Sequence, residues 1–91
     1  MDNLEVFEGD PLEKWAEVIV HASFKRSFEE LDKLLEIRAL CELLLEEEGL
    51  LEKFDALCKQ NRLDPTLQDR IHARKVDLAI DSMARILSGH E

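Results

Sequence analysis

A cluster of basic side chains is the clearest candidate for a binding site in this sequence. Arg70, Arg74 and Lys75 lie within the six residues Arg70-Ile71-His72-Ala73-Arg74-Lys75. Residues four apart share one face of a helix, so Arg70 and Arg74 could hold a phosphate or a carboxylate in a bidentate manner. The competing interpretation, which the acidic excess of the chain favours, is that these side chains form ion pairs with glutamates of neighbouring helices. An anion site is therefore an alternative hypothesis.

Residue types that serve in catalysis or metal binding occur without the spacing that those chemistries need. Cys41 and Cys58 are separated by sixteen residues, and with His21 and His72 they form no paired metal-binding motif. Neither histidine has a nucleophile and a carboxylate nearby in a triad-like pattern. The run Glu46-Glu47-Glu48 is typical of a solvated helix end. We therefore expect no catalytic residue, no metal and no cofactor.

Charge and hydropathy limit the classes of partner. The 91 residues contain 12 Lys and Arg against 21 Asp and Glu, a net charge of −9. Such a surface repels the phosphates of nucleic acids and the anionic face of membranes.

Residues 1–5 lack the basic region of a signal peptide, and the apolar runs of the sequence are too short to span a membrane. We expect one soluble domain over residues 1–91 in the cytoplasm, with reduced cysteines as small core residues.

Helix start signals divide the chain into four helices after an extended arm at residues 1–9. Asp10 and Asp64 each precede a proline, the pattern of an N-cap followed by proline at the first helical position. Ser27 with Glu30 matches a capping box, which predicts a third helix start. The sequence thus predicts an all-α fold with helices at about 11–24, 28–48, 50–60 and 65–88.

The second predicted helix is apolar around nearly its whole circumference over residues 34–45. A helix that is apolar all round must be covered all round, and three short helices of the same chain could hardly do this. The apolar stripe of the last helix also moves from one face to nearly the opposite face. These patterns predict a homodimer whose core includes Trp15, Ile19, Leu34, Ile37, Leu40, Cys41, Leu44, Val76, Ile80, Met83 and Leu87.

Three segments resemble a small family of uncharacterised proteins from epsilonproteobacteria such as Helicobacter and Campylobacter. They are Leu4-Glu5-Val6-Phe7-Glu8-Gly9-Asp10-Pro11-Leu12-Glu13-Lys14-Trp15, Val20-His21-Ala22-Ser23 and Asp81-Ser82-Met83-Ala84-Arg85-Ile86-Leu87-Ser88-Gly89. The resemblance implies a helical homodimer in which two chains wrap through one another in an intertwined, pseudo-knotted bundle. The family is a domain of unknown function, so the resemblance implies no functional residues.

These observations favour a non-enzymatic homodimer that acts as an interaction or scaffold protein and presents acidic helix faces to an unidentified protein partner. The first alternative is a binder of anions or nucleic acid through Arg70, Arg74 and Lys75, which a twofold axis would duplicate. The less favoured alternative is an enzyme with a site at the dimer interface, marked by a perturbed pKa in a cleft.

Overall fold

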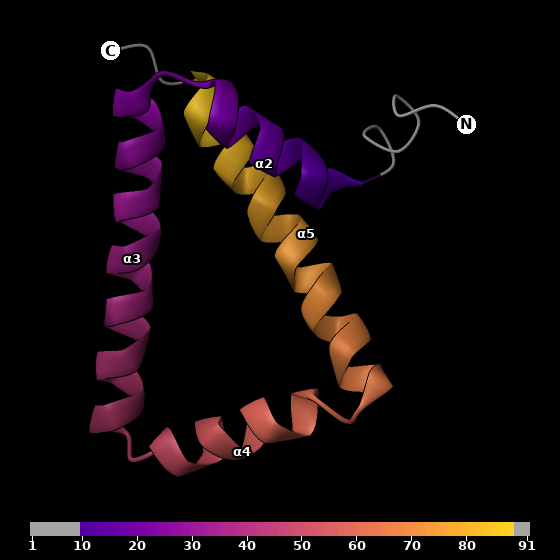
Figure 1. Ribbon diagram of the computed structural model, residues 1–91. Coiled ribbons are helices and arrows are strands. Elements are labelled where there is room, and N and C mark those ends of the chain that lie inside the picture. Colours follow the sequence, from indigo (N-terminus) through magenta and orange to yellow (C-terminus); the bar gives the residue numbers. More distant parts are fainter. Residues whose placement is uncertain (1–9, 89–91) are drawn as a thin grey trace.

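The computed structural model describes residues 10–88, and this range contains helices and no strand. The prediction of an all-helical chain with four helices is therefore confirmed for the described range. The arm predicted at residues 1–9 lies outside it. The helices are α2 (Pro11–His21), α3 (Phe24–Glu47), α4 (Leu51–Asn61) and α5 (Pro65–Ser88) (Figure 1).

Two helix starts have the predicted caps. The Oδ1 atom of Asp10 accepts hydrogen bonds from the backbone N–H groups of Leu12 and Glu13, at 3.1 and 3.4 Å. At the start of α5, Oδ1 of Asp64 accepts from the N–H groups of Thr66 and Leu67, at 3.0 and 3.3 Å. These bonds satisfy N–H groups that the first helical turn leaves without backbone partners, so sequence alone locates both starts.

The start of α3 differs from the prediction. The N-cap is Ser23, whose hydroxyl accepts from the N–H of Arg26 at 3.2 Å, so the helix begins at Phe24 and not after Ser27. The Ser27 hydroxyl instead donates to the carbonyl oxygen of Ile19 on α2, at 2.6 Å. The predicted capping box is wrong because both of its side chains serve tertiary contacts, Glu30 with α5 and Ser27 with α2.

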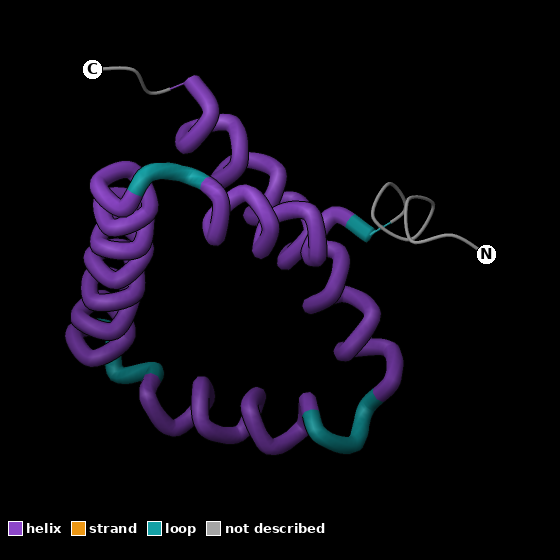
Figure 2. Tube along the Cα trace, turned by 45° about the horizontal axis from the view of Figure 1, so that its top comes forward, coloured by secondary structure: helices purple, strands orange, loops and turns teal. Residues whose placement is uncertain are grey.

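The helices form a flat, open frame. In Figures 1 and 2, α3, α4 and α5 form three sides of a triangle, and α2 lies against the C-terminal half of α5. The chain measures 41 × 37 × 15 Å, and its radius of gyration of 15.9 Å exceeds the roughly 12 Å of a compact domain of this length. Since one helix with its side chains is about 10–12 Å across, most of the frame is a single layer.

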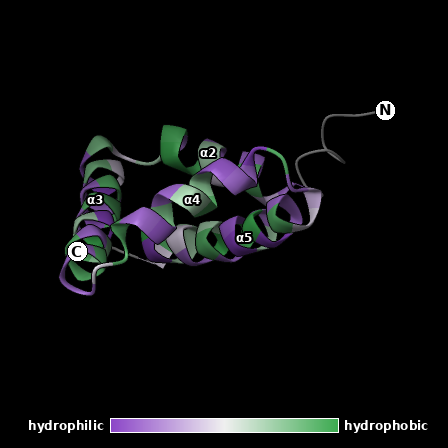
Figure 3. Ribbon diagram, turned by 90° about the horizontal axis from the view of Figure 1, so that it is seen from below, coloured by the Kyte–Doolittle hydropathy of each residue, from purple (hydrophilic) through white to green (hydrophobic). Residues whose placement is uncertain are grey.

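The interior of this chain is small. The buried apolar residues in the described range are Leu67, Ala79 and Ile86, and the buried polar ones are Glu30 and Ser82. Four of these five lie where α2, the first half of α3 and the second half of α5 meet. Figure 3 shows the layer edge-on, with hydrophobic residues on each helix.

Candidate functional site

The predicted dimer-core residues fall into two groups in the single chain. The half-buried group contains Trp15, Ile19, Leu34, Val76 and Met83. The exposed group contains Ile37, Leu40, Cys41, Leu44, Ile80 and Leu87. Leu40 and Leu44 are each 58% exposed, although they belong to the most apolar stretch of the sequence. The described chain therefore leaves the centre of α3 without cover, and Cys41 is not a core residue within it.

An apolar stripe at the start of α3 was missed by the sequence-based reasoning. Phe24 and Phe28 are both exposed, and their rings stack with centroids 6.0 Å apart. Leu31 and Leu35, also exposed, continue the stripe along the same face. The spacing of these residues was a visible signal, but the predicted bounds placed Phe24 at the end of the first helix and Phe28 at the start of the second.

A buried polar network joins α2, α3 and α5. The Glu30 carboxylate of α3 accepts two hydrogen bonds from Arg85 of α5, from Nε at 3.0 Å and from Nη2 at 2.6 Å. The Ser82 hydroxyl donates to Oε2 of Glu30 at 2.6 Å, and the indole Nε1–H of Trp15 donates to the Ser82 oxygen at 2.9 Å. Each member thus has a partner, and the network fixes the corner of the frame.

The network keeps Glu30 ionised. Burial by itself would raise the pKa of Glu30, but the hydrogen bonds from Arg85 and Ser82, with the positive charge of Arg85, outweigh burial and lower the pKa below its usual 4.5. The hydrogen bond to Glu30 in turn raises the pKa of Arg85. A carboxylate held in this state accepts hydrogen bonds and does not deliver protons near neutral pH.

The lowered pKa of Glu30 predicts a loss of stability in acid. The ionised carboxylate stabilises the folded chain fully above the usual pKa of 4.5, and this contribution is lost as pH falls through the lower folded value. We expect the free energy of unfolding, measured by urea denaturation at a series of pH values, to fall below about pH 5 and to fall less steeply in Glu30→Gln. Glu29→Gln, at an exposed neighbour, should keep the wild-type slope. Equal slopes for wild type and Glu30→Gln would contradict the prediction.

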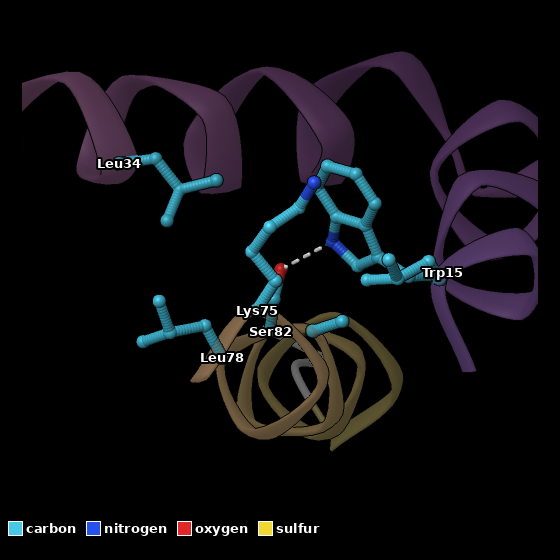
Figure 4. Close-up of a pocket in the computed structure, with 7 residues that line it drawn as sticks. Trp15, Leu34, Lys75, Leu78 and Ser82 are labelled. Atoms are coloured by element: carbon cyan, nitrogen blue, oxygen red, sulfur yellow. Dashed lines mark hydrogen bonds between the residues drawn. The ribbon is translucent and has the colours of Figure 1, made fainter. Parts of the chain in front are cut away.

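A cavity of about 170 Å³ lies between α2, α3 and α5 next to this network (Figure 4). Its wall is almost wholly apolar, and the Trp15 indole forms one side. Among the described residues that line it, Lys75 carries the only charge. The lining residues are Leu12, Trp15, Leu34, Lys75, Leu78, Ala79 and Ser82. A wider hollow of about 400 Å³ at the other end of α2 is lined by Lys14, Glu17, Val18, His21, Ala22 and Leu87.

The three residues of the predicted anion site all lie on α5. Arg70, Arg74 and Lys75 are exposed, and none forms an ion pair with an acidic residue within residues 10–88. Lys75 alone lines the cavity, because it precedes Ser82 by seven residues and so shares its face of α5. Arg70 and Arg74 are not among the residues that line the cavity.

Comparison with known protein families gives a match over most of the chain. A family model described as "Domain of unknown function (DUF2018)" matches residues 7–91. A search of curated proteins found no match. Within the described range, every helix is too short or too polar to cross a membrane. The match covers nearly the whole chain, and its description names neither an activity nor a ligand.

Proposed function

The chain belongs to the DUF2018 family of domains of unknown function, and for it we propose a non-enzymatic role as a homodimeric interaction or scaffold protein. In this proposal, two copies cover each other's apolar helix faces and present acidic faces to a partner protein. The observation that carries it is the single-layer frame with large apolar side chains exposed on it.

The exposed area supports a second layer supplied by another chain. The chain exposes 7449 Å², whereas a compact monomer of 10.5 kDa exposes about 5,400 Å². Domains are stabilised when at least two layers of secondary structure pack around one core. A chain that exposes this much surface can bury a large part of it only against another chain.

The distribution of this apolar surface favours an intertwined dimer over a side-by-side contact. On α3, Leu31, Leu35, Leu40, Leu43 and Leu44 are exposed, and at about 3.6 residues per turn they span more than half of the circumference. A partner on one side would leave part of this surface in water. Two chains that wrap through one another can cover it, which is the pseudo-knotted arrangement that the resemblance implies.

Two further observations support a non-enzymatic cytoplasmic protein. Glu30, the buried carboxylate of the described range, is held ionised by Arg85, so it does not serve as a general acid. Cys41 and Cys58 are both free, as is usual in a reducing compartment. The net charge of −9 supplies the acidic surface that the partner protein would meet.

The test of the dimer is its mass. Sedimentation velocity and light scattering from nanomolar to micromolar protein should give twice the 10.5 kDa of one chain. A folded monomer at micromolar concentration would contradict the proposal.

Affinity capture of the tagged dimer from cytosol at two salt concentrations then tests the scaffold role. One enriched protein would support that role, and nucleic acid recovered at low salt only would support the alternative function.

Intertwined chains should exchange subunits slowly, because exchange requires each chain to unfold substantially. We expect isotope-labelled and unlabelled dimers, mixed at neutral pH, to form mixed dimers at the rate of global unfolding, measured by native mass spectrometry. Exchange much faster than unfolding would exclude the intertwined arrangement while leaving a side-by-side dimer.

The alternative function, binding of nucleic acid or another polyanion, is supported by the lack of ion pairs at Arg70, Arg74 and Lys75 within the described range. If it is correct, Arg74→Ala should weaken binding to single-stranded DNA and reduce the slope of log affinity against log salt by about one. Arg38→Ala serves as the control, because Arg38 already pairs with Glu42 at 2.8 Å. Equal affinities of wild type and Arg74→Ala would eliminate the alternative.

A further inference from the structure

The cavity between α2, α3 and α5 has a feature that the dimer proposal does not use. Lys75 lies on the face of α5 that also carries Ile71, Leu78 and Ala79, and it is the charged residue in an otherwise apolar wall. In Figure 4 its side chain extends along the cavity toward Trp15. A lysine on the apolar face of a helix departs from the usual pattern, and such departures concentrate at functional sites.

The polar groups of the cavity limit what it can bind. The Ser82 hydroxyl donates its one proton to Glu30 and accepts from Trp15, so its donor is already used. The Lys75 ammonium group therefore remains as the polar contact for an occupant. One cation beside apolar walls suits one anionic group joined to an apolar body, whereas a phosphate ester or nucleotide would leave charges and hydroxyl groups unpaired.

We propose that this cavity binds a small apolar monocarboxylate, with the carboxylate at Nζ of Lys75 and the apolar body against Leu12, Trp15, Leu34 and Leu78. The cavity has a volume of about 170 Å³. If each carbon group of the ligand fills roughly 30 Å³, the volume of one water molecule in the liquid, then the cavity holds an apolar body of about six carbons. Leu78, 57% exposed, would be covered by such a body.

Two of the residues that line this site, Trp15 and Leu34, are also predicted dimer-core residues, so the site borders the surface that a second copy would cover. Much of the exposed apolar surface that supports the dimer lies on α4 and on α3 beyond Leu34, for example at Leu40, Leu44 and Leu57. The cavity instead lies at the corner that the chain closes by itself through Trp15, Ser82 and Glu30. A carboxylate can pair with Lys75 at this corner, which a purely apolar side chain of a second copy cannot do.

The test uses Trp15, the one tryptophan of the sequence, as a reporter in the cavity wall. Hexanoate is titrated into the full chain while tryptophan fluorescence is recorded, with hexan-1-ol and hexylamine as probes of similar size and different charge. We expect a saturable change with hexanoate and an affinity for the other two that is weaker by about tenfold or more, because a charge-assisted hydrogen bond is lost. Lys75→Met should weaken the affinity for hexanoate by the same factor, and Lys75→Arg should retain it. Lys53→Met, a matched change on α4, should bind hexanoate as tightly as wild type.

Three results would overturn the proposal. Equal affinities for hexanoate and hexan-1-ol, or an unchanged affinity in Lys75→Met, would show that Lys75 does not hold the carboxylate. No saturable change in Trp15 fluorescence would show that the cavity binds no such ligand. Sedimentation at saturating hexanoate separates this site from the dimer: if hexanoate dissociates the dimer over its own binding range, a second copy occupies the cavity.

Discussion

Arg85→Met should destabilise the protein by about 3 kcal/mol, because it leaves the carboxylate of Glu30 buried without its cation. The Glu30 side chain is 4% exposed and loses both hydrogen bonds from the guanidinium group. The Arg85 side chain is 38% exposed, so water can partly replace it, which places the expected loss at the low end for buried ion pairs. Urea denaturation at one fixed protein concentration measures the loss, since the stability of a dimer depends on concentration.

A double variant provides the control for this loss. In Glu30→Leu/Arg85→Met, neither charge remains in the corner, so the protein should be more stable than Arg85→Met alone. Arg38→Met removes the cation of the exposed ion pair with Glu42 and should change stability by less than about 1 kcal/mol. A loss in Arg85→Met no larger than that in Arg38→Met would show that Glu30 is solvated, and the account of the network would be wrong.

Leu40→Ala should cost about 2–5 kcal/mol if a second chain covers α3, the usual loss for a buried leucine cut back to alanine. Within the single chain Leu40 is 58% exposed, and truncation at such a position changes stability by less than about 0.5 kcal/mol. The two values are far enough apart for one denaturation series to decide between them. The loss in the dimer should be accompanied by a weaker association constant in sedimentation equilibrium.

Leu63 is the matched control, because it lies in the turn between α4 and α5 and is 85% exposed. Leu63→Ala should leave both stability and association near the wild-type values. If Leu40→Ala changes stability and association as little as Leu63→Ala does, then no second chain buries the centre of α3. That result would contradict the homodimer proposal, because this stretch is the most apolar in the sequence.

The features predicted correctly from the sequence are local ones. The caps at Asp10 and Asp64 depend on hydrogen bonds that reach two or three residues along the chain, and a proline follows each cap. The start of α3 was predicted wrongly because Ser23 and Ser27 could each cap a helix. The choice between them depends on contacts of Ser27 with α2 and of Glu30 with α5, which no local pattern contains.

The sequence by itself determined that the chain is helical, where two of its helices begin, and that α3 carries more apolar surface than one small chain can cover. Those properties follow from short-range hydrogen bonding and from the period of the helix. Only the tertiary structure decided that Trp15, Glu30, Ser82 and Arg85 form one network, with partners 52 to 67 residues apart, and that Lys75, unlike Arg70 and Arg74, lines a cavity. The physical reason is that the crossing of α2 and α3 over α5 selects which residues meet.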